Sequence, residues 1–239
     1  MNVLSVEYPG YGVYKGTPTA KGILEDAEIV FDFLTYEMMI DPKKIFLMGR
    51  SIGTGPATYL ASSRESGLLI LLSAYTSIKE VAGARFGSLA KLMVAERFRN
   101  VDEIEKVTSP CFFLHGSKDT LIPSSHTHEL FKKCKAVSGM SIGEAMTHNY
   151  FDIKKDILRP IVNFLKTLDF KHKAETINFP KYTSTEVVFK GKLKLKESKT
   201  PTLKEEKEQY LALSPHSFSA GVAYHGMITA RAKAVKWDW

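Results

Sequence analysis

Residues 67–74, GLLILLSA, contain no charged side chain and are apolar apart from a terminal glycine and one serine. A strand with one face in water alternates apolar and polar side chains, whereas a strand covered on both faces is apolar throughout. A run of this length and composition is therefore typical of a buried parallel strand. Such a strand needs helices on both faces of its sheet, so this run favours an α/β fold.

Strand-like and helix-like segments alternate along the first 168 residues. Apolar runs predict strands at residues 2–8, 44–49, 67–74, 110–116 and 137–145. Apolar side chains at helical spacing predict helices at residues 19–39, 52–63, 124–134 and 152–168, the last broken or kinked by Pro160. The alternation predicts a mostly parallel sheet in a three-layer domain over residues 1–170. The pattern ends there, and for residues 171–239 we expect a basic, irregular C-terminal extension with at most a hairpin.

Composition excludes several functional classes. Six of the seven net positive charges come from residues 171–239, which hold 13 Lys and Arg against 7 Asp and Glu, whereas residues 1–170 hold 20 against 19. A near-neutral body offers no electrostatic footprint for nucleic acid, and we expect only a weak attraction of the extension to an anionic membrane surface. No run of about 18 apolar residues and no signal-like start is present. Cys111 and Cys134 predict free thiols in a reducing, cytoplasmic compartment.

The segment IFLMGRSIGTGPA carries the strongest chemical signal. It places Ser51 in a Gly-x-Ser-x-Gly turn between a predicted strand and a predicted helix, with Gly49 and Gly53 on either side. A nucleophile elbow needs small residues at these positions because the strand and the helix pass very close to each other. We therefore predict that Ser51 is a nucleophile.

A serine hydroxyl needs a histidine to take its proton and a carboxylate to hold that histidine. In this fold type the chain order is Ser, then Asp or Glu, then His, on loops that follow later strands. Asp119 directly follows the apolar strand at 110–116, and His148 precedes the last helix. Asp119 and His148 are thus the preferred partners of Ser51.

Other titratable residues carry less weight. His115 is expected to be a packed or hydrogen-bonded histidine, and Asp152 is an alternative to Asp119. His126 and His128 lie two positions apart on a helix and point in different directions, so they make a poor metal pair. Four acidic residues are expected to be solvated helix charges: Asp26, Asp32, Glu103 and Glu105. With no phosphate-cradling glycine loop and no metal-ligand cluster, we expect no cofactor and no metal.

Five segments, in order YPGYGVYKGTP, LMGRSIGTGPATYLAS, LLSAYTSI, VTSPCFFLHGSKDTLIP and THN, together resemble the α/β-hydrolase superfamily, in particular the branch of the domain 17 proteins. The resemblance covers residues 2–168. It implies an α/β-hydrolase fold and a serine hydrolase of acyl thioesters or esters, with protein depalmitoylation as the activity of the complete form. The substrate would be an acylated protein or a small acyl ester.

The resemblance also implies roles for single residues. Ser51 would be the nucleophile, Asp119 the orienting acid and His148 the base, and the backbone N–H of Ile52 would be one oxyanion donor. Arg50 stands where relatives often have glutamine, and Thr147 stands where glycine is usual.

The family pattern further implies that the chain begins at the fourth strand of the fold, without the first three strands and the loop that gives the second oxyanion donor. The strand at 2–8 then lacks its usual neighbour, and we expect it either to slide against the strand at 44–49 or to detach. A catalytically inactive relict or binding module is therefore the alternative function.

Residues 77–100 are the best candidate for a cap over the site. Four apolar side chains there either line a slot for a fatty chain or belong to the core, which is the favoured alternative: Phe86, Leu89, Leu92 and Met93.

Overall fold

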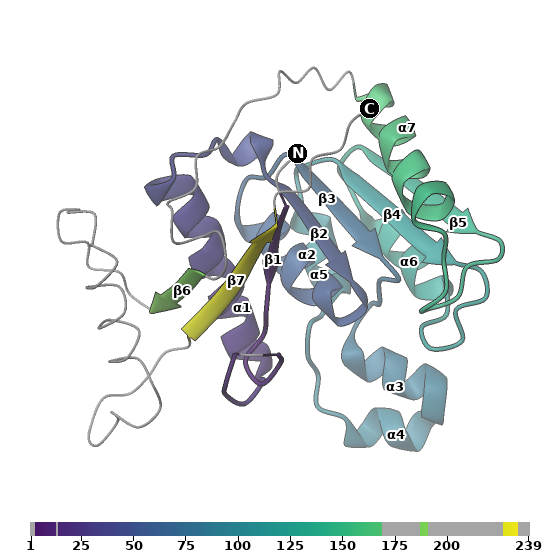
Figure 1. Ribbon diagram of the computed structural model, residues 1–239. Coiled ribbons are helices and arrows are strands. Elements are labelled where there is room, and N and C mark those ends of the chain that lie inside the picture. The colour runs from purple at the N-terminus through teal and green to yellow at the C-terminus, as the bar shows by residue number, and fades with distance from the viewer. Residues whose placement is uncertain (1–2, 13, 169–186, 191–226, 234–239) are drawn as a thin grey trace.

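The main sheet has four parallel strands. The computed structural model describes residues 3–12, 14–168, 187–190 and 227–233 (Figure 1). The strands lie in the order β2 (Phe46–Arg50), β3 (Leu68–Leu72), β4 (Cys111–Gly116) and β5 (Ser138–Gly143). In the register of this sheet, Gly49 lies beside Leu71, and Leu71 lies beside Phe113. Four of the five predicted strands are thus confirmed as one parallel sheet.

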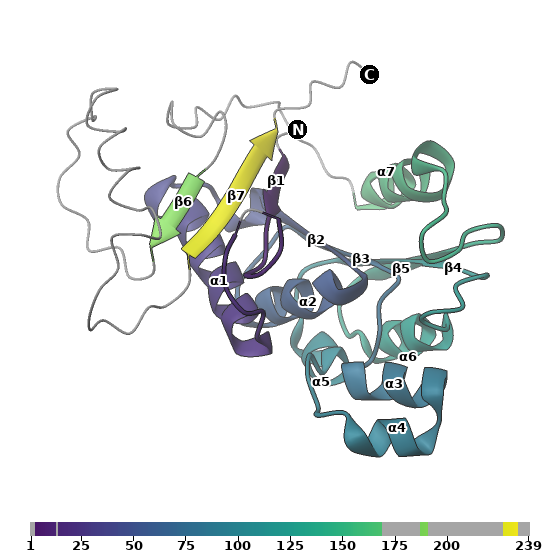
Figure 2. The ribbon, with the colours of Figure 1, turned by 60° about the horizontal axis from the view of Figure 1, so that its bottom comes forward.

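Side chains of β3 alternate between two core layers, as an apolar strand covered on both faces must. Leu69 and Leu71 pack in one cluster with Ala57 of α2 (Thr54–Ser63) and Leu130 of α6 (Ser125–Lys133). The other three leucine and isoleucine side chains of β3 pack with Phe164 of α7 (Arg159–Thr167). Figure 2 shows α7 on one face of the sheet and α2 and α6 on the other. The predicted three-layer arrangement is confirmed.

Local sequence explains where the outer helices begin and break. α1 (Ala20–Asp32) starts after Thr19, whose side chain accepts a hydrogen bond from the Gly22 N–H at 3.0 Å, and it continues as a π-helical segment, Phe33–Glu37. At the other end of the domain, a π-helical segment, Ile153–Leu158, precedes α7, and Pro160 lies in the first turn of α7. The helical backbone is continuous from the π-helical segment into α7, with Leu158 in the right-handed helical region, so the predicted break or kink at Pro160 stays a prediction.

The first strand does not belong to the main sheet. β1 (Val3–Val6) pairs antiparallel with β7 (Met227–Lys233), and β7 pairs antiparallel with β6 (Val187–Lys190). β1 therefore does not slide against β2 but joins a separate three-stranded sheet with the C-terminal segment (Figure 1). The remainder of residues 171–239, with its predicted irregular and membrane-attracted character, lies outside the described residues.

A short helical hairpin follows β3. It consists of α3 (Ile78–Phe86) and α4 (Ser88–Met93), and α5 (Asn100–Glu103) comes next. The four apolar side chains Phe86, Leu89, Leu92 and Met93 are each between 71 and 80% exposed. Assigning them to the core was wrong, because the hairpin directs them to solvent, and their role as the lining of a slot for a fatty chain stays a prediction. Among the described residues, no helix is long and apolar enough to cross a membrane.

Candidate active site

Ser51 lies in a strained turn between β2 and α2. Its φ is 51°, in the left-handed region that non-glycine residues rarely occupy and that costs about 1 to 3 kcal/mol where it is maintained. Two hydrogen bonds hold the turn: the Thr54 hydroxyl donates to the Ser51 carbonyl at 2.7 Å, and the Tyr75 hydroxyl donates to the Ile52 carbonyl at 3.1 Å. Strain that neighbouring contacts maintain is common at functional residues.

A side chain would clash at only one of the two glycines of the motif. A Cβ added to Gly49 would lie 2.4 Å from the Gly53 carbonyl oxygen and 2.7 Å from the Thr54 Cα, both backbone atoms that cannot yield. A Cβ added to Gly53 would meet only the Tyr8 hydroxyl, at 3.4 Å, which is ordinary contact. The close approach predicted for the elbow is thus present at Gly49, while Gly53 contributes its backbone to that approach.

Ser51, His148 and Asp119 form one hydrogen-bonded chain. The distance from Ser51 Oγ to His148 Nε2 is 3.0 Å, and from His148 Nδ1 to Asp119 Oδ2 it is 2.8 Å. The three residues come from the ends of three segments separated by up to 97 positions in the sequence. Asp119 and His148 are both buried, with 6 and 9% of their surfaces exposed.

The carboxylate of Asp119 is held on both oxygens. Its Oδ1 accepts the backbone N–H groups of Leu121 at 3.0 Å and Ile122 at 2.9 Å, which leaves Oδ2 for His148. Burial raises the pKa of Asp119, but the Ile122 N–H and the contact with His148 outweigh burial, so the pKa lies below its ordinary value. An ionised carboxylate only accepts, so His148 Nδ1 carries the ring proton and Nε2 is the acceptor that faces Ser51.

Arg50 makes contacts that the sequence did not predict. One terminal nitrogen of Arg50 donates to the His148 carbonyl and to the Asn149 side chain, both at 2.7 Å. The guanidinium carbon lies 5.6 Å from the centroid of the Phe151 ring. The loop that carries His148 is also closed by hydrogen bonds between Thr147 and Tyr150. Arg50 thus holds the loop that carries His148. The only feature of the sequence that could have indicated this role is its position next to Ser51.

The other candidate residues do not contact Ser51. His115 is fully buried beside the carboxylate of the series: its Nε2 lies 3.4 Å from Asp119 Oδ2 and 2.8 Å from the Ile122 carbonyl, and its Nδ1 lies 2.6 Å from the Thr127 hydroxyl. Asp152 caps a helical segment by accepting the Lys155 N–H at 2.8 Å. The surface assignment of Asp26 was wrong: it is 2% exposed, and burial raises its pKa to about 6. Its helix turns this position inward, toward Tyr14.

Within the described part of the chain, no group of three or more His, Cys, Asp and Glu side chains is placed to hold a metal ion. The backbone N–H of Ile52 directly follows the Ser51 Cα, at the start of the turn that leads into α2. The arrangement presents a hydroxyl, an imidazole and a buried carboxylate in series, which is the chemistry of an activated serine.

Comparison with known proteins identifies relatives. Human α/β-hydrolase domain-containing protein 17B is 34% identical over 164 residues, which are 69% of this chain and 56% of that protein. The α/β-hydrolase domain-containing protein 17C of Xenopus tropicalis is 34% identical over 165 residues, which are 69% of this chain and 52% of that protein. The chain thus spans about half the length of the curated relatives it matches. No family model matches it.

Among solved structures, the orthorhombic form of Pyrococcus horikoshii acylaminoacyl peptidase superposes with a TM-score of 0.50 at 14% identity, over 67% of this chain and 30% of that one. At this identity the likeness concerns the fold alone. The resemblance and the fold class predicted from the sequence are confirmed.

Proposed function

We propose that this chain is a serine hydrolase of acyl thioesters or esters of the α/β-hydrolase superfamily, whose domain 17 branch it resembles. The observation that carries the proposal is the hydrogen-bonded series from Ser51 Oγ through His148 to Asp119. The resemblance to the domain 17 proteins supports the finer proposal, the removal of fatty acyl groups from protein cysteines.

In the proposed acylation step, His148 Nε2 takes the proton of Ser51 as Oγ attacks the acyl carbonyl carbon. The imidazolium that forms is stabilised by the ionised Asp119 carboxylate at 2.8 Å. The backbone N–H of Ile52 donates to the oxyanion of the tetrahedral intermediate. Collapse of the intermediate breaks the bond to the leaving thiol or alcohol, which receives the proton from His148.

In the proposed deacylation step, the same groups act on water. His148 Nε2 removes a proton from a water molecule, whose oxygen attacks the carbonyl carbon of acyl-Ser51. Ser51 leaves with the proton that His148 returns to it, and the free acid departs. No cofactor or metal enters either step.

The proposal is tested by a fluorophosphonate probe and by two acyl substrates, palmitoyl-coenzyme A and p-nitrophenyl butyrate. We expect the probe to form an adduct at Ser51, located by peptide mass spectrometry, and both substrates to be hydrolysed. A monodisperse chain that unfolds cooperatively, takes no label and turns over neither substrate would overturn the proposal in favour of a binding module.

Arg50→Gln tests the contact between the elbow and the histidine loop. We expect kcat to fall about tenfold with little change in KM, because hydrogen bonds from a charged donor to the loop contribute about 1.5 to 3 kcal/mol and their loss lets His148 shift. Steady-state kinetics measure the effect, and Arg85→Gln, which removes an exposed guanidinium from α3, is the matched control. A loss seen equally in both variants would contradict a positioning role for Arg50.

A further inference from the structure

Both cysteines of the chain lie at one core cluster. Cys111 begins β4, and Cys134 directly follows α6, whose Leu130 packs in the same cluster. After Cys134 the chain returns to the sheet, where the Cys111 N–H donates to the Val137 carbonyl at 2.9 Å. This path brings together two thiols that are separated in the sequence by the whole of α6 and the loop before it.

The two sulfurs contact each other. The Cys111 S–H donates a hydrogen bond to the Cys134 sulfur. The Cys111 sulfur also lies 3.3 Å from the Ser109 carbonyl oxygen, and the Cys134 sulfur lies 3.9 Å from the Ala136 carbonyl oxygen. A disulfide needs a sulfur–sulfur distance of about 2.05 Å, so sulfurs in hydrogen-bond contact have to approach by about 1.5 to 2 Å. Rotation about side-chain torsions moves a sulfur by this much without displacing the backbone.

The contact makes the two thiols chemically unequal. The hydrogen bond from Cys111 lowers the pKa of Cys134 against the opposing effect of burial, whereas the same bond, together with burial, raises the pKa of Cys111. Cys111 is fully buried, and Cys134 is partly exposed. The thiolate is the reactive form of cysteine, so Cys134 is the thiol that meets a small oxidant and Cys111 is the thiol behind it.

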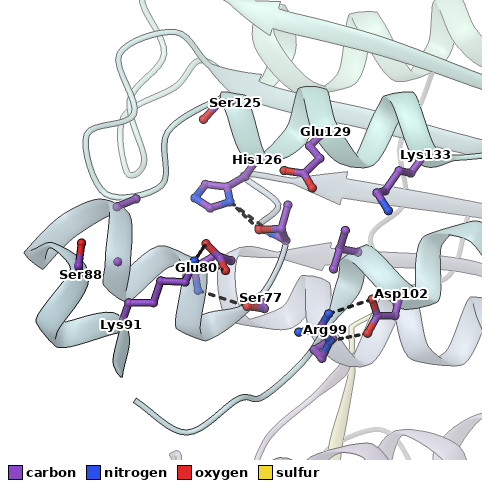
Figure 3. Close-up of a pocket in the computed structure, with 14 residues that line it drawn as sticks. Ser77, Glu80, Ser88, Lys91, Arg99, Asp102, Ser125, His126, Glu129 and Lys133 are labelled. Atoms are coloured by element: carbon purple, nitrogen blue, oxygen red, sulfur yellow. Dashed lines mark hydrogen bonds and ion pairs between the residues drawn. The ribbon is translucent and has the colours of Figure 1, made fainter. Parts of the chain in front are cut away.

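Positive charge surrounds Cys134. Lys132 and Lys133 lie in the last turn of α6, and Lys135 follows Cys134. Lys133 and Lys135 each pair with Glu105 at 3.1 Å, so one carboxylate faces two cations. Figure 3 shows Lys133 on α6, where it lines a polar cavity of about 710 Å³. An excess of cations beside a cysteine favours its thiolate.

We propose that Cys111 and Cys134 form a redox pair that hydrogen peroxide converts into a reversible disulfide. The Cys134 thiolate attacks one peroxide oxygen, the O–O bond breaks, and the hydroxide that leaves takes up a proton, so that a sulfenic acid and a water molecule form. The Cys111 sulfur then attacks the Cys134 sulfur, and the hydroxide released from the sulfenic acid takes the Cys111 proton. Two thiols are thus oxidised, and one peroxide is reduced to two water molecules.

The disulfide closes a ring of the chain that contains Asp119, which lies between the two cysteines in the sequence. Stable disulfides are rare in reducing compartments, and those that form there are mostly transient and respond to oxidants. The pair does not depend on Ser51 being a nucleophile, so it can be tested without any turnover.

The test treats the full chain with hydrogen peroxide and then counts its free thiols with N-ethylmaleimide under denaturing conditions. Since the chain has two cysteines, we expect the count to fall from two to none and to return to two after dithiothreitol. Peptide mass spectrometry should find Cys111 linked to Cys134 within a monomer. Three outcomes would overturn the proposal: thiols that peroxide leaves unchanged, a loss that dithiothreitol does not reverse, and a disulfide between two chains.

Two variants separate the roles of the thiols. In Cys134→Ser we expect peroxide to consume the Cys111 thiol at least about tenfold more slowly than in the wild type, because a buried thiol of raised pKa reacts poorly. In Cys111→Ala we expect Cys134 to stop at a sulfenic acid, which dimedone traps. Thermal unfolding identifies folded variants. Loss of the Cys111 thiol at the wild-type rate in folded Cys134→Ser would overturn the assignment of Cys134 as the thiol that meets the oxidant.

Discussion

Ser51→Ala is expected to lower kcat for acyl substrates about 10⁴- to 10⁶-fold, the range found when the nucleophile of a serine triad is removed. The variant keeps Asp119 and His148 in place but offers no oxygen to attack the carbonyl carbon, so no acyl-enzyme forms. Stopped-flow measurement of the acylation burst, together with mass spectrometry of the trapped protein, gives the size of the loss.

Ser63→Ala is the matched control for Ser51→Ala, because it removes an exposed hydroxyl from the C-terminal end of α2. The Ser51 variant should melt at or slightly above the wild-type temperature, since replacing the residue does not remove a core contact. Substantial turnover by a folded Ser51→Ala protein would show that the hydrolysis proceeds without this serine.

Asp119→Asn is expected to lower kcat about 10⁴-fold although it changes a single atom. The backbone N–H groups of Leu121 and Ile122 both need an acceptor, so the Asn oxygen takes the place of Oδ1. The NH2 group then faces His148 Nδ1, which must become an acceptor. The ring proton moves to Nε2, and His148 can no longer take the proton of Ser51.

The acid dependence of stability gives a separate readout for this substitution. Because the pKa of Asp119 is lower in the folded chain than its ordinary value of about 3.9, the ionised carboxyl stabilises the fold above about pH 4. That contribution is lost as the pH falls through the lowered pKa, whereas Asp119→Asn has none to lose. Urea unfolding at several pH values measures the difference, with Asp156→Asn as the control. Near wild-type kcat in a folded Asp119→Asn protein would contradict the expected shift of the His148 ring proton to Nε2.

The candidate site was largely predictable because each of its residues sits at an element boundary. Ser51 lies between a strand and a helix, Asp119 follows the apolar strand β4, and His148 precedes the last helix. Parallel strands bring their C-terminal ends to one edge of a sheet, so chain order alone places these boundaries near one another. The Arg50 contact with the His148 loop was not predictable, because it joins side chains and carbonyls 98 and 99 positions apart.

The burial of side chains could be predicted where an element is apolar on every side. The prediction failed where only one face of an element is apolar. Every residue of β3 is buried, as its composition requires. The apolar side chains of the α3–α4 hairpin are exposed, and Asp26 is buried, because a helical period shows that a face exists but not what covers it.

By itself the sequence determined the parallel α/β architecture, the elbow at Ser51 and the order of the serine, acid and histidine, since these follow from local periodicity and from the approach of backbone at Gly49. Only the tertiary structure decided that β1 pairs with β7, that Arg50 holds the histidine loop, and that the thiols of Cys111 and Cys134 contact each other. These features depend on the relative placement of segments distant in the chain, which the pattern of any one segment does not encode.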